Sequence, residues 1–178
     1  MQAIKVNANG WVDIARHIPS PNQDTRPDGQ PISLIVIHNI SLPPQQYGGN
    51  GVIQLFTNQL DPEAHPYYAE IYQLRVSSHF FIRRDGSLIQ FVSCNQRAWH
   101  AGVSVWQGRE RCNDFSIGIE LEGSDFDTFE ASQYVVLNSL LVGLKQAYPI
   151  SDVVGHSDIA PGRKTDPGNF FDWSQVTI

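Results

Sequence analysis

Residues 115–122 read FSIGIELE, and from residue 117 onward aliphatic residues alternate strictly with glycine or glutamate. Successive side chains of a β-strand point to opposite faces, so the aliphatic residues at 117, 119 and 121 share one face. Gly118, Glu120 and Glu122 share the other face. Burying a carboxylate in the middle of an apolar strand is costly unless the group is paired or its pKa is raised, which makes Glu120 a candidate general base. We expect Glu122, nearer the strand end, to be solvated and Gly118 to leave room for a ligand.

A second buried strand is predicted at residues 33–37, SLIVI, because the run is too short for a helix and rich in β-branched side chains. His38 follows directly. A histidine at the end of such a strand opens onto the crevice in which α/β proteins place their sites. His38 is therefore a candidate functional residue.

A hairpin is predicted within residues 76–92, where an Asp-Gly pair at 85–86 suits a two-residue turn between apolar runs. Pairing outward from this turn sets Ile82 opposite Ile89, and the phenylalanines at 80 and 91 opposite each other. One face of the hairpin is then apolar, and His79 points to the other face.

Two helices are also predicted. Residues 52–60 carry apolar side chains at helical spacing, and Asn50 is placed to cap them. Residues 127–148 form a longer helix, in which tyrosines and leucines recur at steps of three and four. Asp127 is expected to cap this helix, with Glu130 as the reciprocal partner.

The length and composition indicate one domain. The chain has 178 residues, of which 41% are hydrophobic, enough for one compact core and too few for two. We expect a single domain over residues 1–178. Within it, residues 1–31 are polar and rich in proline, and they predict an arm that wraps on the domain with Trp11 and Ile14 as its anchors.

The net charge limits the classes of partner, and the cysteines indicate the cellular compartment. Twelve Lys and Arg against 18 Asp and Glu give a net charge of −6, which disfavours nucleic acid and anionic wall polymers and favours a small-molecule substrate. No run is long enough to cross a bilayer, and the N-terminus lacks an export signal, so we expect no membrane partner. Cys94 and Cys112 form no C-x-x-C pair and are expected to be buried free thiols, which fits a cytoplasmic protein.

Residues 155–168 read GHSDIAPGRKTDPG, and they are predicted to leave a short strand at 152–154 as a stiff loop. His156 and Asp166 are plausible metal ligands, with His38 as the candidate third ligand. Two imidazoles and one carboxylate leave the fourth position of zinc for water, which is the pattern of a catalytic site. The alternative is structural, with His38 as a hydrogen-bonded core residue and Asp166 as a turn cap.

The chemistry of such a site is hydrolytic. Zinc polarises a carbonyl and lowers the pKa of bound water to about 7, so cleavage of an amide or ester is the natural reaction. Glu120 would take the proton of the water, and Lys164 would stabilise the oxyanion. The deaminase pattern H-x-E with P-C-x-x-C and the protease pattern H-E-x-x-H are both absent.

Several segments together resemble the type 2 amidase and peptidoglycan-recognition-protein superfamily. They are VIHNISLPP at 36–44, SHF at 78–80 with RDG at 84–86, RAWHAG at 97–102, CNDFSIGIELEG at 112–123, and GHSDIAPGRKTDPG at 155–168. The resemblance runs from Trp11 to Trp173 and is strongest to the bacterial cytoplasmic amidases that recycle cell-wall fragments. It implies a single-domain α/β fold in which a mixed central β-sheet is flanked by helices.

The resemblance also implies a reaction. Zn²⁺ would be held by His38, His156 and Asp166, with Glu120 and Lys164 as catalytic partners. The bond cut would be the amide between the lactyl group of 1,6-anhydro-N-acetylmuramic acid and L-alanine in recycled muropeptides. In the family, loss of this activity lets muropeptides accumulate and can induce β-lactamase. We expect a monomer whose sugar- and peptide-binding residues are Asn39, Arg75, Trp99, His100 and Arg109.

Two alternatives remain at this point. A non-hydrolytic peptidoglycan-binding module would keep the fold without turnover, although recognition alone would not need a water-activating carboxylate such as Glu120. A phage-type amidase would act on intact peptidoglycan, although the acidic balance of the chain favours small fragments as substrates.

Overall fold

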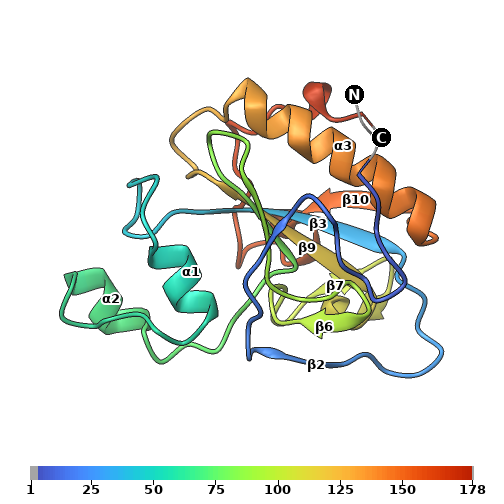
Figure 1. Cartoon of the computed structure of the whole chain (residues 1–178), viewed down its shortest axis with the longest axis horizontal. Coiled ribbons are helices and arrows are strands. Elements are labelled where there is room, and N and C mark those ends of the chain that lie inside the picture. Colours follow the sequence, from blue (N-terminus) through green and yellow to red (C-terminus); the bar gives the residue numbers. More distant parts are fainter. Residues whose placement is uncertain (1–3, 178) are drawn as a thin grey trace.

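The computed structural model describes residues 4–177, which are built around a six-stranded sheet of order β1-β5-β4-β9-β3-β10 (Figure 1). Neighbouring strands run parallel except β4 and β5, so the sheet is mixed, as predicted. The strands are β1 (Arg16–His17), β3 (Leu34–Ile40), β4 (Phe80–Ile82), β5 (Leu88–Gln90), β9 (Ser116–Glu122) and β10 (Asp152–Gly155). Two small antiparallel pairs join β2 (Gln23–Thr25) to β6 (Gln96–Ala98), and β7 (Val105–Trp106) to β8 (Arg109–Glu110).

The longest strands, β3 and β9, are neighbours in the interior of the sheet and pair in parallel over seven residues each. His38 is paired with Glu120 in this register. β10 lies on the other side of β3, where Gly155 is paired with Ile37, so the chain leaves β10 at His156 beside His38. The carboxyl ends of three parallel strands therefore meet at one edge, which is where α/β proteins place their sites.

The long helix α3 (Ala131–Ala147) covers one face of the sheet (Figure 1). Its leucines pack against the isoleucines of β3 and β9 in the largest buried cluster of the described chain. Ile117, Ile119 and Leu121 all belong to this cluster, which confirms the predicted alternation of β9. Glu120 consequently points to the opposite face of the sheet.

The start of α3 differs from the prediction. The helix begins four residues later than predicted, because Glu130 is its N-cap and the Gln133 side chain accepts the Glu130 backbone N–H at 3.0 Å. Asp127 is occupied elsewhere, since its carboxylate accepts hydrogen bonds from Tyr47 and Ser124.

The helices α1 (Gly51–Phe56) and α2 (Pro66–Ile71) lie on the other side of the sheet (Figure 1). Leu55 and Phe56 of α1 pack in a second cluster with Phe81. The prediction of a helix to residue 60 was wrong, because Asn58 adopts a left-handed conformation, with φ of 59°, that ends the helix. Asn50 occupies the N-cap position, but its side chain makes no capping hydrogen bond.

The hairpin of β4 and β5 is shifted by one residue from the predicted register. Phe81 pairs with Ile89, instead of Ile82 with Ile89. The backbone closes between Arg83 and Ser87, so the loop has three residues rather than two. Its last residue, Gly86, has φ of 85°, which fits a type I turn followed by a left-handed glycine. The extra loop residue is the physical reason for the shift.

The N-terminal arm is anchored differently from the prediction. Ile14 is 66% exposed, whereas Val12 and Ala15 are buried in the core. Trp11 is half-buried and packs on the His17 ring, with 4.7 Å between ring centroids. The arm also adds β1 to the edge of the main sheet and β2 to β6.

The predictions for the two cysteines and for membrane-crossing segments can be compared with the fold. Cys94 and Cys112 are buried free thiols, as predicted. Among residues 4–177, no helix combines the length and the apolar character that a bilayer crossing requires.

The remaining helices are short: α4 (His156–Ile159) and the 3₁₀ turns η1 (Cys112–Asp114) and η2 (Trp173–Gln175).

Candidate metal centre and active site

Three side chains converge at the carboxyl edge of the sheet. His38 ends the buried part of β3, His156 begins α4 directly after β10, and Asp166 lies further along the same loop. The two histidine Nδ1 atoms are 3.0 Å apart, and each lies 3.0 Å from Oδ2 of Asp166. The segment 155–168, predicted as a loop, thus begins with the helical turn α4. The Ser157 N–H donates to the Asp166 carbonyl, and this hydrogen bond holds Asp166 close to His156.

The outward nitrogens of both histidines are also engaged. His156 Nε2 lies 3.0 Å from the Ala101 carbonyl, which can only accept, so Nε2 carries the proton and Nδ1 presents a lone pair. His38 Nε2 lies 2.9 Å from His100 Nδ1. Both ligand histidines are buried, and burial lowers the pKa of His38, which favours the neutral ring that binds metals.

These atoms form a group that could hold a metal ion. The 3.0 Å separations are close to the spacing of about 3.3 Å between the ligands of a tetrahedral zinc ion with bonds of about 2.0–2.1 Å. Two imidazoles and one carboxylate suit zinc chemically and leave a fourth position open. His38, His156 and Asp166 all line the same cavity, so the open position is accessible to a substrate. The residues present therefore fit a catalytic metal ion.

Glu120 lies beside this group on the neighbouring strand. Its side chain is buried, and one of its oxygens, Oε2, has no hydrogen-bond partner among the described residues. Burial, together with the nearby negative charge of Asp166, raises the pKa of Glu120 well above its ordinary value, although Lys164 opposes the shift. A carboxylate with a raised pKa that lines a cavity has the properties of a general base.

Lys164 also lines the cavity, two residues before Asp166 in the same loop. Its side chain is exposed, and its backbone N–H is held by the Ala160 carbonyl at 3.1 Å. The ammonium group is therefore available to a ligand, while the backbone that carries it is fixed. Such a group can stabilise negative charge on a reacting oxygen.

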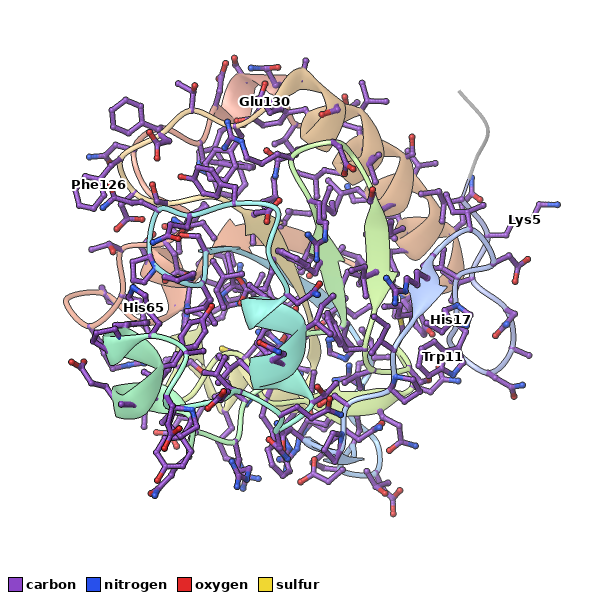
Figure 2. All side chains as sticks on the ribbon, turned by 60° about the vertical axis from the view of Figure 1, so that its left-hand side comes forward. Lys5, Trp11, His17, His65, Phe126 and Glu130 are labelled. Atoms are coloured by element: carbon purple, nitrogen blue, oxygen red, sulfur yellow. The ribbon has the colours of Figure 1, made fainter. Side chains whose placement is uncertain are left out.

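The cavity that contains these groups has a volume of about 570 Å³. One part of its wall is apolar and comes from α1, α2 and the loops beside them, and the part near His38 is polar. Phe126, 68% exposed, belongs to the lining, and Figure 2 shows it on the side of the molecule opposite Trp11 and His17. A ligand would meet both an apolar surface and a polar reaction centre.

Comparison with known proteins assigns the chain to a family. A family model described as N-acetylmuramoyl-L-alanine amidase matches residues 28–169. The chain belongs to this amidase family. The curated 1,6-anhydro-N-acetylmuramyl-L-alanine amidase AmpD of Escherichia coli (strain K12) is 54% identical over 171 residues, which cover 95% of this chain and 93% of that protein. AmpD of Haemophilus influenzae is 53% identical over 178 residues, with coverage of 98% and 97%.

Solved structures of amidases agree with this assignment. A crystal structure of an AmpD derivative has a TM-score of 0.93 at 52% identity and covers 99% of this chain and 100% of that chain. The amidase AmiD from E. coli, solved with the substrate anhydro-N-acetylmuramic acid-L-Ala-D-gamma-Glu-L-Lys, has a TM-score of 0.60 at 32% identity. That alignment covers 83% of this chain and 57% of AmiD.

In the amidase fold of this chain, three of the predicted substrate-binding residues line the cavity, namely Asn39, Trp99 and His100. Trp99 is half-buried. The Asn39 side-chain amide already donates to Asp125 at 2.7 Å and to the Pro167 carbonyl at 3.0 Å. Only its side-chain oxygen is left for a ligand.

Arg75 and Arg109 do not line this cavity. Arg75 is exposed and donates to the backbone carbonyls of Tyr72 and Leu74. Arg109 lies over the Phe115 ring at 3.6 Å and bonds to the Ser33 hydroxyl. Their predicted contact with substrate therefore stays a prediction.

Two expectations about β9 were wrong. The space over Gly118 is filled by the His100 ring, so no ligand can occupy it. Glu122 is buried rather than solvated, because its carboxylate accepts the backbone N–H groups of Gly48 at 2.7 Å and Arg84 at 3.1 Å.

The sequence analysis also missed residues that line or brace the site. Asp125 accepts hydrogen bonds from Asn39 of β3 and from Thr165, the residue next to Asp166, and so links β3 to the loop that carries Asp166. Arg163 donates to the carbonyls of Ala101 and Val103. Arg163 lies in the loop that the sequence had marked as functional, whereas no motif marks Asp125.

Proposed function

We propose that the chain is a zinc-dependent amidase that hydrolyses the bond between the lactyl group of 1,6-anhydro-N-acetylmuramic acid and L-alanine. The observation that carries the proposal is the convergence of three ligand atoms, 3.0 Å apart, beside the buried carboxylate of Glu120. The near full-length similarity to proteins named 1,6-anhydro-N-acetylmuramyl-L-alanine amidase supports the substrate. The cavity volume and its mixed lining suit a muropeptide fragment.

In the proposed hydrolysis, the metal ligands, Glu120 and Lys164 each have a separate role. When bound by His38, His156 and Asp166, zinc would polarise the scissile carbonyl and make a water molecule acidic enough to ionise near pH 7. Glu120 would accept the proton of that water and pass it to the amine of the departing L-alanine. The Lys164 ammonium would donate a hydrogen bond to the carbonyl oxygen as it becomes negatively charged.

The remaining residues would bind the substrate. Trp99 lines the cavity, and its ring would pack against the sugar, since aromatic side chains offer flat apolar surface. The Asn39 oxygen would accept a hydrogen bond from the substrate, while Arg75 and Arg109 would have to move toward the cavity to reach a peptide carboxylate. We further propose that the chain works in the cytoplasm as a monomer on small recycled fragments, a role with no need for nucleic acid or membrane.

The deciding experiment uses a purified 1,6-anhydro-N-acetylmuramyl peptide, with zinc content measured on the same enzyme sample. Cleavage at the lactyl amide, about one zinc per chain and loss of activity with a chelator are the expected results. Zinc binding without cleavage would contradict the proposal and indicate a peptidoglycan-binding module. Preferential release of peptide from intact sacculi would contradict the substrate and indicate an amidase directed at the cell wall.

A further inference from the structure

His100 contacts both His38 of the candidate metal centre and Ser116 of β9. Its Nδ1 is 2.9 Å from Nε2 of His38, and its Nε2 is 3.1 Å from the Ser116 hydroxyl. The rings of His100 and His38 meet edge to face, with 5.0 Å between centroids. Both nitrogens of His100 are therefore engaged within the protein, which leaves neither of them free for a substrate.

The direction of these hydrogen bonds follows from the role of His38. To present a lone pair at Nδ1 toward the ligand group, a neutral His38 must carry its proton on Nε2. His38 Nε2–H then donates to His100 Nδ1, and His100 Nε2–H donates to Ser116 Oγ. A neutral imidazole has one donor and one acceptor nitrogen, so His100 can accept at Nδ1 while it donates from Nε2.

The His100 ring cannot swing away from this position easily. It lies directly on Gly118 of β9, where a Cβ atom would clash with the ring. The backbone N–H groups of His100 and Ala101 both donate to the side-chain oxygen of Asn113, at 3.1 Å and 2.9 Å. Ser116, which ends the chain of hydrogen bonds, is fully buried.

The adjacent residue supports the other histidine ligand. The Ala101 carbonyl accepts from His156 Nε2 at 3.0 Å and from Arg163 at 2.8 Å. Two consecutive residues, one through its side chain and one through its backbone, therefore hold the outward nitrogens of both ligand histidines. Partners of this kind fix the tautomer and the orientation of a metal-binding imidazole.

We propose that His100 is a positioning residue that orients His38 for metal binding, and not a substrate contact. The proposal rests on the proposed metal site and goes beyond it, because it assigns the role of a residue outside the ligand set. It predicts that loss of the His100 acceptor weakens zinc binding itself.

The test is a chelator-competition titration of zinc on metal-free protein, with KM and kcat measured at saturating zinc. His100→Leu removes the acceptor, and its zinc Kd should rise by about 10- to 100-fold, the usual effect of losing such a partner. His100→Asn keeps an acceptor at the position of Nδ1 and should restore most of the affinity. Val103→Ala, on the same loop with an 86% exposed side chain, should leave zinc affinity and kinetics unchanged.

The outcomes separate this inference from the proposed function. An unchanged zinc Kd in His100→Leu with a raised KM would overturn the inference, because His100 would then contact the substrate. If the wild-type chain bound no zinc, both proposals would fail. Should His100→Leu not fold, Ser116→Ala serves as the second variant, since it removes the acceptor of His100 Nε2–H. Its zinc affinity should fall by a smaller factor, and wild-type affinity in Ser116→Ala would also count against the inference.

Discussion

His38 and Glu120 are paired residues on neighbouring parallel strands, β3 and β9, at the carboxyl edge of the sheet. The strand register therefore places an imidazole of the candidate metal centre beside a buried carboxylate without help from any loop. Sites built on strands hold their geometry more closely than sites built on loops. The other two ligand residues come from the segment after β10, which pairs with β3 on its other edge.

Glu120→Gln should keep zinc affinity and lose most of the turnover. The amide has nearly the same shape as the carboxyl group but cannot accept a proton, so kcat should fall by about 10²- to 10⁴-fold, the usual contribution of a general base. The rate of muropeptide cleavage at saturating substrate and the zinc content of the same sample would measure the two effects. A near-normal kcat in this variant would show that another group takes the proton.

Asp166→Ala should weaken zinc binding directly. Oδ2 of Asp166 is the only anionic atom of the ligand triangle, 3.0 Å from each histidine nitrogen. The zinc Kd should rise by more than about 100-fold, since loss of an outer partner alone costs 10- to 100-fold. Asp166→Cys offers a thiolate ligand instead and should retain zinc. Equal zinc content in wild type and Asp166→Ala after dialysis would remove Asp166 from the ligand set.

Lys164→Met should lower kcat without changing zinc affinity. The side chain is exposed and lines the cavity, and no side-chain hydrogen bond or ion pair joins it to the candidate ligand atoms among residues 4–177. Its loss should therefore remove mainly the positive charge that we propose for stabilising the reacting oxygen. Loss of one oxyanion donor costs about 10²- to 10³-fold in kcat. Lys5→Met is the matched control, because Lys5 is exposed on the side of the molecule away from Phe126 (Figure 2). A rise in KM alone would assign Lys164 to substrate binding.

The sequence alone could predict the parts of the site that depend on strands. Alternation in β9 placed Glu120 on the face opposite the isoleucines, and the apolar run before His38 placed that residue at a strand end. Both predictions depend only on the period of two in a β-strand, which is a local property.

The parts that failed depend on contacts between distant segments. Glu122 is buried because backbone N–H groups of residues 48 and 84 bind its carboxylate, and no local pattern reports those partners. The space over Gly118 is filled by His100, eighteen positions earlier in the chain. The hairpin register was wrong because Gly86 extends the loop by one residue, and sequence pairing cannot distinguish a two-residue loop from a three-residue one.

Asp125→Ala should loosen the wall of the site and destabilise the protein. The carboxylate accepts from Asn39 at 2.7 Å and from Thr165 at 2.5 Å, and hydrogen bonds to charged groups contribute about 1.5–3 kcal/mol each. The free energy of unfolding in urea should fall by about 2 kcal/mol or more, and KM should rise because the loop next to Asp166 is less well held. Asp28→Ala, at an exposed carboxylate, is the control and should leave both quantities unchanged. Unchanged stability in Asp125→Ala would mean that the two hydrogen bonds do not hold these segments together.

Stability should also depend on pH through His79, a fully buried imidazole that accepts the Gly118 backbone N–H at 3.0 Å. Burial and the neighbouring Arg26 guanidinium lower the pKa of His79 from 6.5 to about 3. Between these values the unfolded chain binds a proton that the folded chain does not, so this contribution is complete above pH 6.5 and is lost as the pH falls toward 3. Its slope is about 1.4 kcal/mol per pH unit.

His79→Asn tests this linkage because the amide does not titrate and still offers an oxygen to the Gly118 N–H. The free energy of unfolding of the metal-free protein, measured in urea between about pH 4 and pH 6, should fall less steeply with decreasing pH in the variant. The variant is expected to be less stable than wild type at pH 7, because its shorter side chain cannot reach the Gln96 carbonyl that lies 3.1 Å from His79 Nε2. The difference between the two proteins should therefore narrow toward low pH. Parallel curves for the two proteins would show that His79 takes up its proton in the folded state as readily as in the unfolded chain.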